Sequence, residues 1–528
     1  MLVSVFFGGC LVLFLYVYEY LIMKPKRQRS KLEKQGIRGP CPSIFLGNIP
    51  EIKNIHLKLH SKSTETAIEA HHEQEQEQPI ISNNISHDWP STIFPHLKQW
   101  QTQYGPVFMY STGSIQILCI TDAEMVKEVS LCTSLNLGKP SYLSKDRGPL
   151  LGQGILATSG SIWAHQRKII APELYLDKVK SMVNLMVDST TSLLESWESR
   201  IKSEGEIADI NIDQDLRSLS ADIISRACFG SNFSQGKQIF SKIRNLQKVM
   251  SNQTIGVPGS RYMPNKSNKE MWRLEKEIKS MILSVVKHRV EASYERDLLQ
   301  MILESAKNYS DGDSLTLGIT RDKFIVDNCK NIYFAGHETT AIAASWSLML
   351  LAANPEWQDR ARAEVLEICR DGVPNADMLQ SMKTLTMVIQ ETLRLYPPAV
   401  FVGREALEDM KLKNILVPKG VNIQIPISML HQNPHIWGPD SHKYNPERFQ
   451  NGVLEASKIP HAYIPFGLGN RVCAGQHLAM IELKVILSLI LSKFCFSLSP
   501  AYQHCPAFRL VIEPKDGVRL HMRRLQLW

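Results

Sequence analysis

The sequence lacks any close grouping of cysteines. Its ten cysteines are scattered over 528 residues, and none of them forms a Cys-x-x-Cys motif. A disulfide framework and a zinc site built from several thiolates both require closely and regularly spaced cysteines. The pattern therefore indicates reduced thiols that face the cytosol, and a metal would have to depend on a single cysteine.

A linker between domains is also missing. Beyond the N-terminal fifth of the chain, no stretch rich in Pro, Gly and Ser interrupts the sequence, and no internal repeat is visible. With 44% hydrophobic residues, the chain can build one large domain around a sizeable core. Helical periodicity dominates, for example over residues 179–201 and 322–353, while short β-like segments occur early and late. We expect a mainly α fold with a minor β-sheet region.

No Lys or Arg precedes the first apolar run. This run covers residues 1–23, which is long enough to span a bilayer as a helix. A cleaved signal peptide would begin with basic residues, whereas here the basic cluster follows the apolar run. The positive-inside bias then keeps the body of the protein in the cytosol. The sequence predicts one transmembrane anchor over residues 1–23, a basic and Pro-rich hinge over residues 24–48, and a single domain over residues 49–528.

Net positive charge is scarce outside the hinge. Residues 24–38 hold seven Lys or Arg against one Glu, so they carry most of the net charge of +8. A nucleic-acid-binding function loses its main support, because this charge lies where anionic lipid head groups would be. Within the body, residues 61–78 form a polar, low-complexity insertion that we expect to be solvated and disordered.

Four separated motifs need a common explanation. "PFGLGNRVCAG" places three glycines and an arginine around Cys473, and "FAGHETT" places residues that disfavour helices in the middle of the longest predicted helix. "ETLRLYPP" puts Glu391 and Arg394 on one helical face, and "YNPERF" presents Arg448 in a turn. Taken alone, each motif has an ordinary explanation, such as a surface ion pair or an inert buried thiol. Their order and spacing in one chain favour a common function over these separate explanations.

Together these motifs resemble those of the cytochrome P450 monooxygenases, and the resemblance covers the chain from the hinge onward. The family's cysteine signature, Phe-x-x-Gly-x-Arg-x-Cys-x-Gly, is matched in full. Gln432 and Asn433 depart from the family, because relatives commonly carry Arg and Asp there. The matching residues are Phe466, Gly469, Arg471, Cys473 and Gly475 in the cysteine loop, Ala335, Gly336, Glu338 and Thr339 in the helix, Glu391 with Arg394, Pro446 to Phe449, and Trp163 with Arg167.

The resemblance implies the cytochrome P450 fold and makes residues 49–528 a heme-thiolate catalytic domain. Its cofactor is heme b, with iron ligated by the Cys473 thiolate, an electron-rich ligand that favours O–O cleavage. We expect Gly469 to adopt a positive φ, and backbone N–H groups to point at the sulfur. The implied cofactor-binding residues are Trp163, Arg167, Ala335, Gly336, Arg404, Phe466, Gly469, Arg471 and Gly475, with the arginines and Trp163 at the heme propionates.

The same resemblance assigns the other motifs. Ala335 and Gly336 leave room for dioxygen and substrate, Thr339 hydrogen-bonds the oxygen, and Glu338 relays protons. A structural network behind the heme is formed by Glu391, Arg394 and Arg448. Electrons come from NADPH through NADPH–cytochrome P450 reductase at the endoplasmic reticulum membrane, since the chain has no flavin or nicotinamide motif. A non-catalytic membrane heme sensor is the alternative of another class, but it would not need the acid and the alcohol beside the oxygen site.

The substrate is inferred from resemblance alone. The chain is similar to the plant branch that contains gibberellin oxidases, which implies a small apolar substrate of polycyclic terpenoid type. We expect hydroxylation or epoxidation of a gibberellin-type or kaurenoid diterpenoid acid, with pentacyclic triterpenoid acids as the alternative. The expected pocket segments are residues 145–156, the helix face at residues 334–335, residues 399–402 and the turn near Gly517. Arg147 and His337 are candidate partners for a substrate carboxylate.

Overall fold

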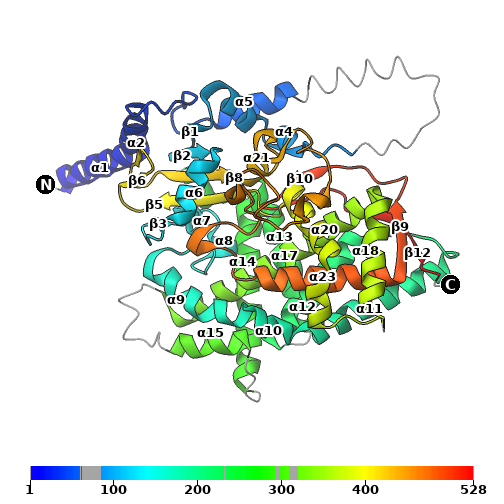
Figure 1. The fold of residues 1–528 in the computed structure, drawn as a ribbon. Coiled ribbons are helices and arrows are strands. Elements are labelled where there is room, and N and C mark those ends of the chain that lie inside the picture. Colours follow the sequence, from blue (N-terminus) through cyan, green and yellow to red (C-terminus); the bar gives the residue numbers. More distant parts are fainter. Residues whose placement is uncertain are drawn as a thin grey trace.

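The computed structural model describes residues 2–526 except residues 60, 62–84, 231–232, 254, 258, 292–296, 308–318 and 371. Apart from Ser61, the insertion expected over residues 61–78 lies outside the described residues. Helices make up most of the fold (Figure 1). The longer ones are α1 (Leu2–Tyr18), α2 (Lys24–Glu33), α5 (Pro95–Tyr104), α6 (Ala123–Leu131), α9 (Gly160–Ile170), α11 (Val183–Ser203), α12 (Ile212–Phe229), α13 (Phe233–Ser251), α14 (Lys266–Glu291), α15 (Leu298–Ala306), α17 (Arg321–Ala353), α18 (Pro355–Ile368), α20 (Lys383–Leu395) and α23 (Gln476–Lys493).

Shorter helices connect these elements. They are α4 (Trp89–Ile93), α7 (Ser141–Lys145), α8 (Gly148–Leu151), α10 (Leu176–Lys180), α19 (Ala376–Ser381), α21 (Ile427–His431) and α22 (Pro434–Trp437). Single turns of 3-10 helix occur at Ala171–Leu174, Ser260–Tyr262, Pro446–Phe449, Pro460–Ala462 and Gly469–Arg471. The last of these turns is formed by the predicted cysteine loop.

The main sheet has five strands in the order β1-β2-β8-β5-β3. β1 (Val107–Thr112) and β2 (Ile115–Ile120) form an antiparallel hairpin, and β2 pairs in parallel with β8 (Asn422–Pro426). β5 (Phe401–Ala406) is antiparallel to both β8 and the short β3 (Leu137–Gly138). The sheet therefore brings residues near 120, 138 and 404 to one side of the molecule.

Three smaller β units complete the fold. β4 (Ala208–Asn211), β12 (Arg519–Arg524) and β9 (Phe494–Leu498) form a three-stranded antiparallel sheet. β6 (Met410–Leu412) pairs with β7 (Ile415–Val417), and β10 (Pro506–Phe508) pairs with β11 (Ile512–Pro514). The mainly α fold with a minor β region is confirmed.

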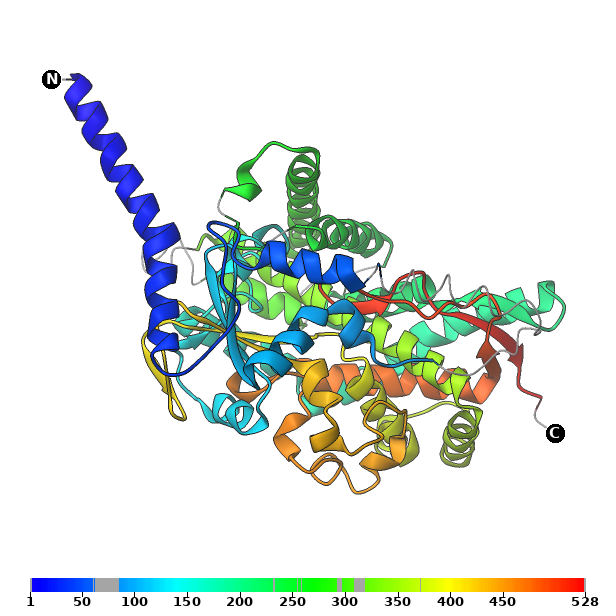
Figure 2. The same ribbon diagram turned by 90° about the horizontal axis from the view of Figure 1, so that it is seen from above.

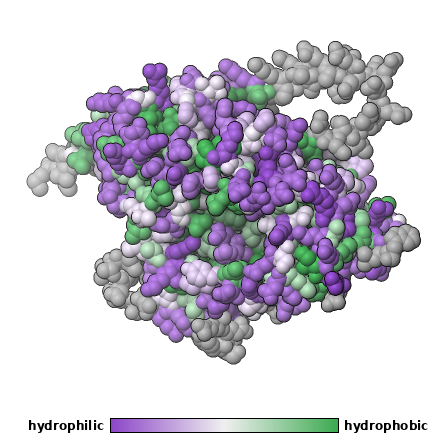
Figure 3. All heavy atoms as spheres, viewed as in Figure 1, coloured by the Kyte–Doolittle hydropathy of each residue, from purple (hydrophilic) through white to green (hydrophobic). Residues whose placement is uncertain are grey.

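The helical part is built around α17. Nearly all of this 33-residue helix is buried, and it packs against α12, α20 and α23 (Figures 1 and 2). Its N-terminus is capped by Thr320, whose side-chain oxygen accepts the N–H of Lys323. The expected helix over residues 322–353 thus matches α17 closely, whereas the pattern over residues 179–201 is divided between the end of α10 and α11. Hydrophilic residues cover most of the face in Figure 3, and apolar ones show in several smaller patches, one of them near the middle.

The N-terminal apolar run forms a helix that projects from the body as a rod (Figure 2). It is long and apolar enough to cross a membrane. The helix does not end at Met23, because a π-helical turn at Glu19–Met23 joins α1 to α2. Pro25 stands at the start of α2, where its missing N–H and fixed φ are tolerated directly after the wider turn. The first ten residues of the expected hinge are therefore helical.

Candidate active site

The loop around Cys473 is held closed by its own backbone. The N–H of Cys473 donates to the carbonyl of Phe466 at 2.8 Å, and the N–H of Val472 donates to that of Gly469 at 3.0 Å. Gly469 has a φ of 63°, in the region where a side chain is strained. A Cβ there would also lie 2.7 Å from the carbonyl oxygen of Ser130. Gly469 is thus required both for the turn and for the close contact with the end of α6.

The surroundings of Cys473 act on its sulfur in opposite ways. Burial raises the pKa of the thiol, while the N–H of Gly475 and the charges of Arg167 and Lys139 lower it. The sulfur also lies just before the N-terminus of α23, where the helix dipole favours negative charge. The side chain is nevertheless accessible to solvent. An accessible sulfur with stabilising N–H and cationic neighbours can serve as a thiolate ligand.

Four cations lie around this loop. Arg167 donates to the carbonyl of Val472 at 2.8 Å, and Arg404 donates to that of Leu468 at 3.0 Å. Arg471 donates to the carbonyl of Thr158 at 3.0 Å and stacks over Trp163, with Cζ 4.1 Å from the ring centroid. The fourth cation is Lys139.

The four cations are poorly compensated. Burial lowers the pKa of Lys139 to about 7 and that of both Arg404 and Arg471 to about 10, and no carboxylate contributes to these shifts. Nη2 of Arg471 is buried and has no hydrogen-bond partner among the described residues. Buried cations without carboxylates fit a cofactor that carries anionic groups. Sequence reasoning missed Lys139, since it stands in no motif.

Three residues interrupt the buried run of α17. Ala335, Gly336 and Thr339 are partly accessible, whereas the rest of the helix between Phe324 and Ala352 is buried. Their spacing places them on one helical face. The hydroxyl of Thr339 donates to the carbonyl of Ala335 at 2.7 Å, so its lone pairs remain available on that face.

Gly336 also serves helix packing. A Cβ at this position would lie 2.5 Å from Cδ1 of Ile224 on α12, and the carbonyl oxygen of Gly336 lies 3.4 Å from the hydroxyl of Ser220. The expectation that its small size leaves room for dioxygen did not include this packing. The glycine also allows α12 to approach α17 closely.

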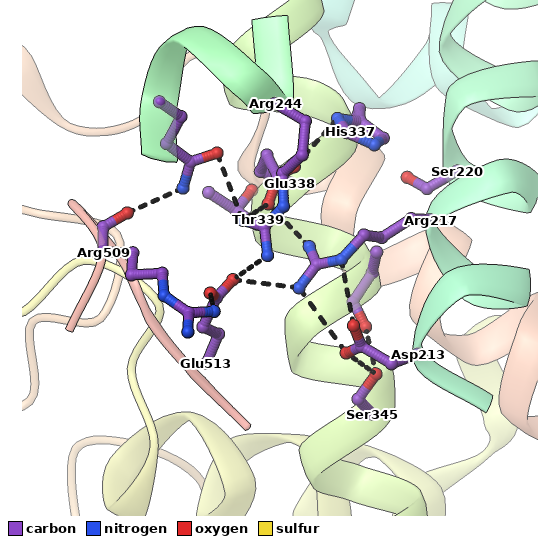
Figure 4. Close-up of polar contacts among 12 residues, drawn as sticks. Asp213, Arg217, Ser220, Arg244, His337, Glu338, Thr339, Ser345, Arg509 and Glu513 are labelled. Atoms are coloured by element: carbon purple, nitrogen blue, oxygen red, sulfur yellow. Dashed lines mark hydrogen bonds and ion pairs between the residues drawn. The ribbon is translucent and has the colours of Figure 1, made fainter. Parts of the chain in front are cut away.

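Glu338 is completely buried and ionically paired. Its Oε2 accepts from Nη1 of Arg217 at 2.6 Å and from Nη1 of Arg244 at 3.2 Å (Figure 4). The two arginines come from α12 and α13, and they also contact Glu513 of β11. The sequence pattern singled out Glu338 but gave no sign of these distant partners.

The two candidate partners for a substrate carboxylate are poorly suited to that role. Arg147 is buried, and its guanidinium donates to the carbonyls of Met250 and Gln253 near the end of α13. Burial, together with nearby Arg217 and Arg244, lowers the pKa of His337 to about 3. His337 is therefore neutral at physiological pH and offers no positive charge.

Glu391, Arg394 and Arg448 are brought together as a buried cluster. Two nitrogens of Arg394 donate to the two oxygens of Glu391, both at 2.7 Å, and neither side chain is exposed. Nε of Arg448 lies 3.5 Å from Glu391 Oε1, and the N–H of Asn445 donates to the same oxygen at 2.9 Å. This cluster joins α20 to the segment that follows α22.

The loop expected to line a substrate pocket is fastened to α17. Side-chain oxygens on two turns of α17 accept backbone N–H groups of this loop at 2.8 to 3.1 Å: Asp327 from Gln153, Asn328 from Ile155 and Asn331 from Leu156. The loop is thereby placed beside the half of α17 that precedes Ala335.

The other expected pocket segments, residues 399–402 and the turn near Gly517, lie beside different parts of the fold. The Phe401 ring lies 6.1 Å from that of Phe508, and the N–H of Ile512 donates to the carbonyl of Pro398, so the β10–β11 hairpin lies beside residues 398–401. The turn at Gly517 instead packs against Asn211, at the start of α12. The hairpin, and not the turn near Gly517, is the C-terminal segment next to residues 398–401.

The family model for Cytochrome P450 matches residues 73–522. The chain belongs to this family. It is 53% identical over 521 residues to Cytochrome P450 714C2 of Oryza sativa subsp. japonica, covering 98% of this chain and 97% of the rice protein. It is 46% identical over 522 residues to Cytochrome P450 714B3 of Zea mays (98% and 95% coverage) and 46% identical over 513 residues to Cytochrome P450 714A2 of Arabidopsis thaliana (95% and 94% coverage).

This P450 is a monooxygenase whose cofactor is a Cys-ligated heme. Among the described residues, no group of three or more His, Cys, Asp or Glu side chains could hold a metal ion. The residues present fit the cofactor: Cys473 offers an accessible sulfur, and the cations near it suit the two propionates. Members of the family generally receive electrons from a reductase.

Proposed function

We propose that this P450 hydroxylates or epoxidises a polycyclic terpenoid, specifically a gibberellin-type or kaurenoid diterpenoid acid. The observation that carries the oxygenation chemistry is the accessible face of α17, formed by Ala335, Gly336 and Thr339. The terpenoid class rests on the resemblance of the motifs to the gibberellin-oxidase branch. The high identity to plant P450s of the 714 group over nearly the whole chain supports this assignment.

Thr339 and Glu338 serve oxygen activation in this proposal. Heme, when bound, activates dioxygen for insertion into a C–H or C=C bond, and this activation consumes two protons and two electrons. Through its hydroxyl, Thr339 would hold a proton at the accessible face of α17, and Glu338 would supply protons from the α12–α13 side. The partial accessibility of Thr339 and the buried contacts of Glu338 with Arg217 and Arg244 support this division of roles.

Cofactor binding is divided between two groups of residues. Cys473 ligates the iron, with Phe466, Gly469 and Gly475 shaping its loop. Trp163, Arg167, Arg404 and Arg471 hold the propionates, with Lys139 as an additional cation. The uncompensated charge of these side chains supports this assignment.

The reaction takes place at the cytosolic face of the endoplasmic reticulum membrane, with electrons delivered from NADPH by NADPH–cytochrome P450 reductase. The projecting apolar helix supports a single-pass anchor. The basic residues of α2, which directly follow the apolar run, support a cytosolic catalytic domain.

Microsomes that contain the expressed protein and its reductase provide the test. With NADPH, they are offered a kaurenoid acid, a gibberellin, a pentacyclic triterpenoid acid, a sterol and a cytokinin, and products are identified by mass spectrometry. We expect product from the diterpenoid acids and none from microsomes that carry Cys473→Ala. Turnover of the triterpenoid acid alone would replace the diterpenoid assignment, and turnover of only the sterol or cytokinin would refute the terpenoid-acid class.

A further inference from the structure

Two arginines and two carboxylates form a closed ring beside the oxygen-site helix. Arg217 donates to Oε2 of Glu338 at 2.6 Å and to Oε2 of Glu513 at 3.0 Å. Arg244 bridges the same two oxygens, at 3.2 Å and 2.6 Å respectively (Figure 4). The ring therefore joins α12, α13 and α17 to the β10–β11 hairpin, and Glu338 shares both of its arginines with Glu513.

Further charges surround the ring. Asp213 lies 3.1 Å from Nε of Arg217, and Arg509 lies 2.7 Å from the second oxygen of Glu513. With these two, the cluster holds three carboxylates and three arginines. The remaining titratable groups nearby are the neutral His337 and Glu482 of α23, which reaches the Gly336 carbonyl only through the hydroxyl of Ser220.

The ring leaves one oxygen of Glu338 unused. Both arginines contact Oε2, whereas the buried Oε1 has no hydrogen-bond partner among the described residues. Nδ1 of His337 lies 3.7 Å from Oε1 and also has no hydrogen-bond partner in the described part of the chain. Buried carboxylate oxygens are rarely left in this way, because desolvation makes it unfavourable. A free oxygen is, however, what proton transfer requires.

We propose that Glu513 is a positioning residue that keeps Oε1 of Glu338 free for proton transfer, so that docking of the β10–β11 hairpin sets proton delivery. The inference rests on the proposed role of Glu338. Each arginine directs one nitrogen to each carboxylate, and Glu513 therefore occupies half of both guanidinium groups. Without Glu513, those nitrogens are released to close on Oε1 of Glu338, and the carboxylate becomes harder to protonate.

The second carboxylate of the ring and its arginines have opposite effects on the ionisation of Glu338. Removing the negative charge at residue 513 stabilises ionised Glu338, whereas removing the positive charge at residue 244 destabilises it. A purely structural role would make both changes act in the same direction. This difference in sign separates positioning from loss of packing.

The test compares Glu513→Gln with Arg244→Gln in the heme-loaded full chain. The measured quantity is the ratio of product to NADPH consumed as a function of pH. We expect the alkaline fall of this ratio to move to lower pH in E513Q and to higher pH in R244Q, by about one pH unit, which is tenfold in proton occupancy. Glu513→Asp, which retains the charge, should largely restore the wild-type profile. Lys242→Gln, on α13 but paired with Glu277 on α14, provides the matched control and should leave the profile unchanged.

A second readout does not need turnover. Infrared difference spectra of the ferric protein against Glu338→Gln isolate the bands of this carboxyl, and their pH dependence should shift in the same two directions. If E513Q does not fold, the shift in R244Q still tests the charge dependence of Glu338 on which the inference rests, and an unchanged or downward shift in R244Q would refute the inference. Shifts of the same sign in E513Q and R244Q would also refute it. Full coupling in Glu338→Gln would overturn the proposed proton role itself, whereas uncoupling in E338Q with a wild-type profile in E513Q would overturn only the role of Glu513.

Discussion

Replacing Arg394 with methionine removes the cation at the centre of a fully buried cluster. Its guanidinium makes two hydrogen bonds to Glu391 and three to the carbonyls of His431, Ser441 and Lys443, at 2.6 to 3.0 Å. Methionine fills much of the volume but donates no hydrogen bond. The change therefore leaves the Glu391 carboxylate and three carbonyls short of their donors.

The expected loss of stability follows from this count. Stranding a buried charge costs about 3 to 5 kcal/mol, and the carbonyls add to this where water cannot reach them. Domains of this kind are typically stable by about 5 to 15 kcal/mol, so R394M removes a large part of the total. Glu391 keeps the N–H of Asn445 and the charge of Arg448, which limits the loss.

Urea unfolding of the heme-loaded protein measures the effect, followed by circular dichroism and by the absorption of the reduced, carbon-monoxide-bound heme. We expect a much lower midpoint for R394M and loss of heme from a large fraction of the protein. Because the two residues are coupled, Glu391→Gln combined with R394M should cost less than the sum of the single changes, by about 1 to 3 kcal/mol. Arg273→Met, which breaks an exposed pair with Glu270, is the control and should leave the midpoint unchanged. A wild-type midpoint in R394M, or additivity in the double variant, would refute the reasoning.

Four further outcomes are expected. Cys473→Ala should abolish the far red-shifted carbon monoxide band of thiolate-ligated heme, and survival of that band would contradict the ligand assignment. Thr339→Ala should retain the band but divert NADPH electrons to peroxide, measured as the ratio of peroxide to product; an unchanged ratio would count against its proton role. Deletion of residues 1–23 should release the protein from membranes with its heme spectrum intact, whereas deletion of residues 1–33 should also destabilise it, because Leu32 is fully buried. Stability should fall as the pH drops from about 6.5 towards 3, because histidines take up protons in this range in the unfolded chain but not when buried in the fold. In urea unfolding at different pH values, each buried histidine should contribute about 1.4 kcal/mol per pH unit to the slope of the unfolding free energy. This slope would be absent if these side chains were charged in the fold. The histidines whose pKa is lowered to about 3 by burial are His87, His96, His337 and His431.

The features predicted well from the sequence are those fixed by local spacing. The positive φ of Gly469, the pairing of Glu391 with Arg394, and the extent of α17 all depend on residues close together in the chain. Such patterns reflect backbone geometry and helical periodicity, and these can be judged within one segment. The same reasoning identified Cys473 as the one cysteine in a specialised loop.

The features missed are those that arise between distant segments. Glu338 meets Arg217, which is 121 residues away, and its second arginine is 94 residues away, so no local pattern could indicate the ring. Gly336 contacts Ile224 of another helix, and Lys139 becomes a neighbour of the cysteine loop only when the sheet forms. The continuation of the N-terminal helix past Met23 was missed for another reason, because the expected anchor was bounded by the end of the apolar run and α2, which continues the helix, is mostly polar.

That uninterrupted N-terminal helix has a mechanical consequence. Residues 2–33 at about 1.5 Å per residue give a rod of about 48 Å, whereas the hydrocarbon core of a bilayer is about 30 Å thick. The excess corresponds to α2, which is fixed to the body where the Gln28 side chain donates to the carbonyl of Lys419 and Lys31 pairs with Asp409. A rod that is fixed to the body at one end moves rigidly with it, so the tilt of the rod in a membrane would set the orientation of the body. In the proposed membrane-anchored arrangement, the body would turn about the axis of the rod without tumbling, and an electron donor in the same membrane would meet it over a restricted set of angles.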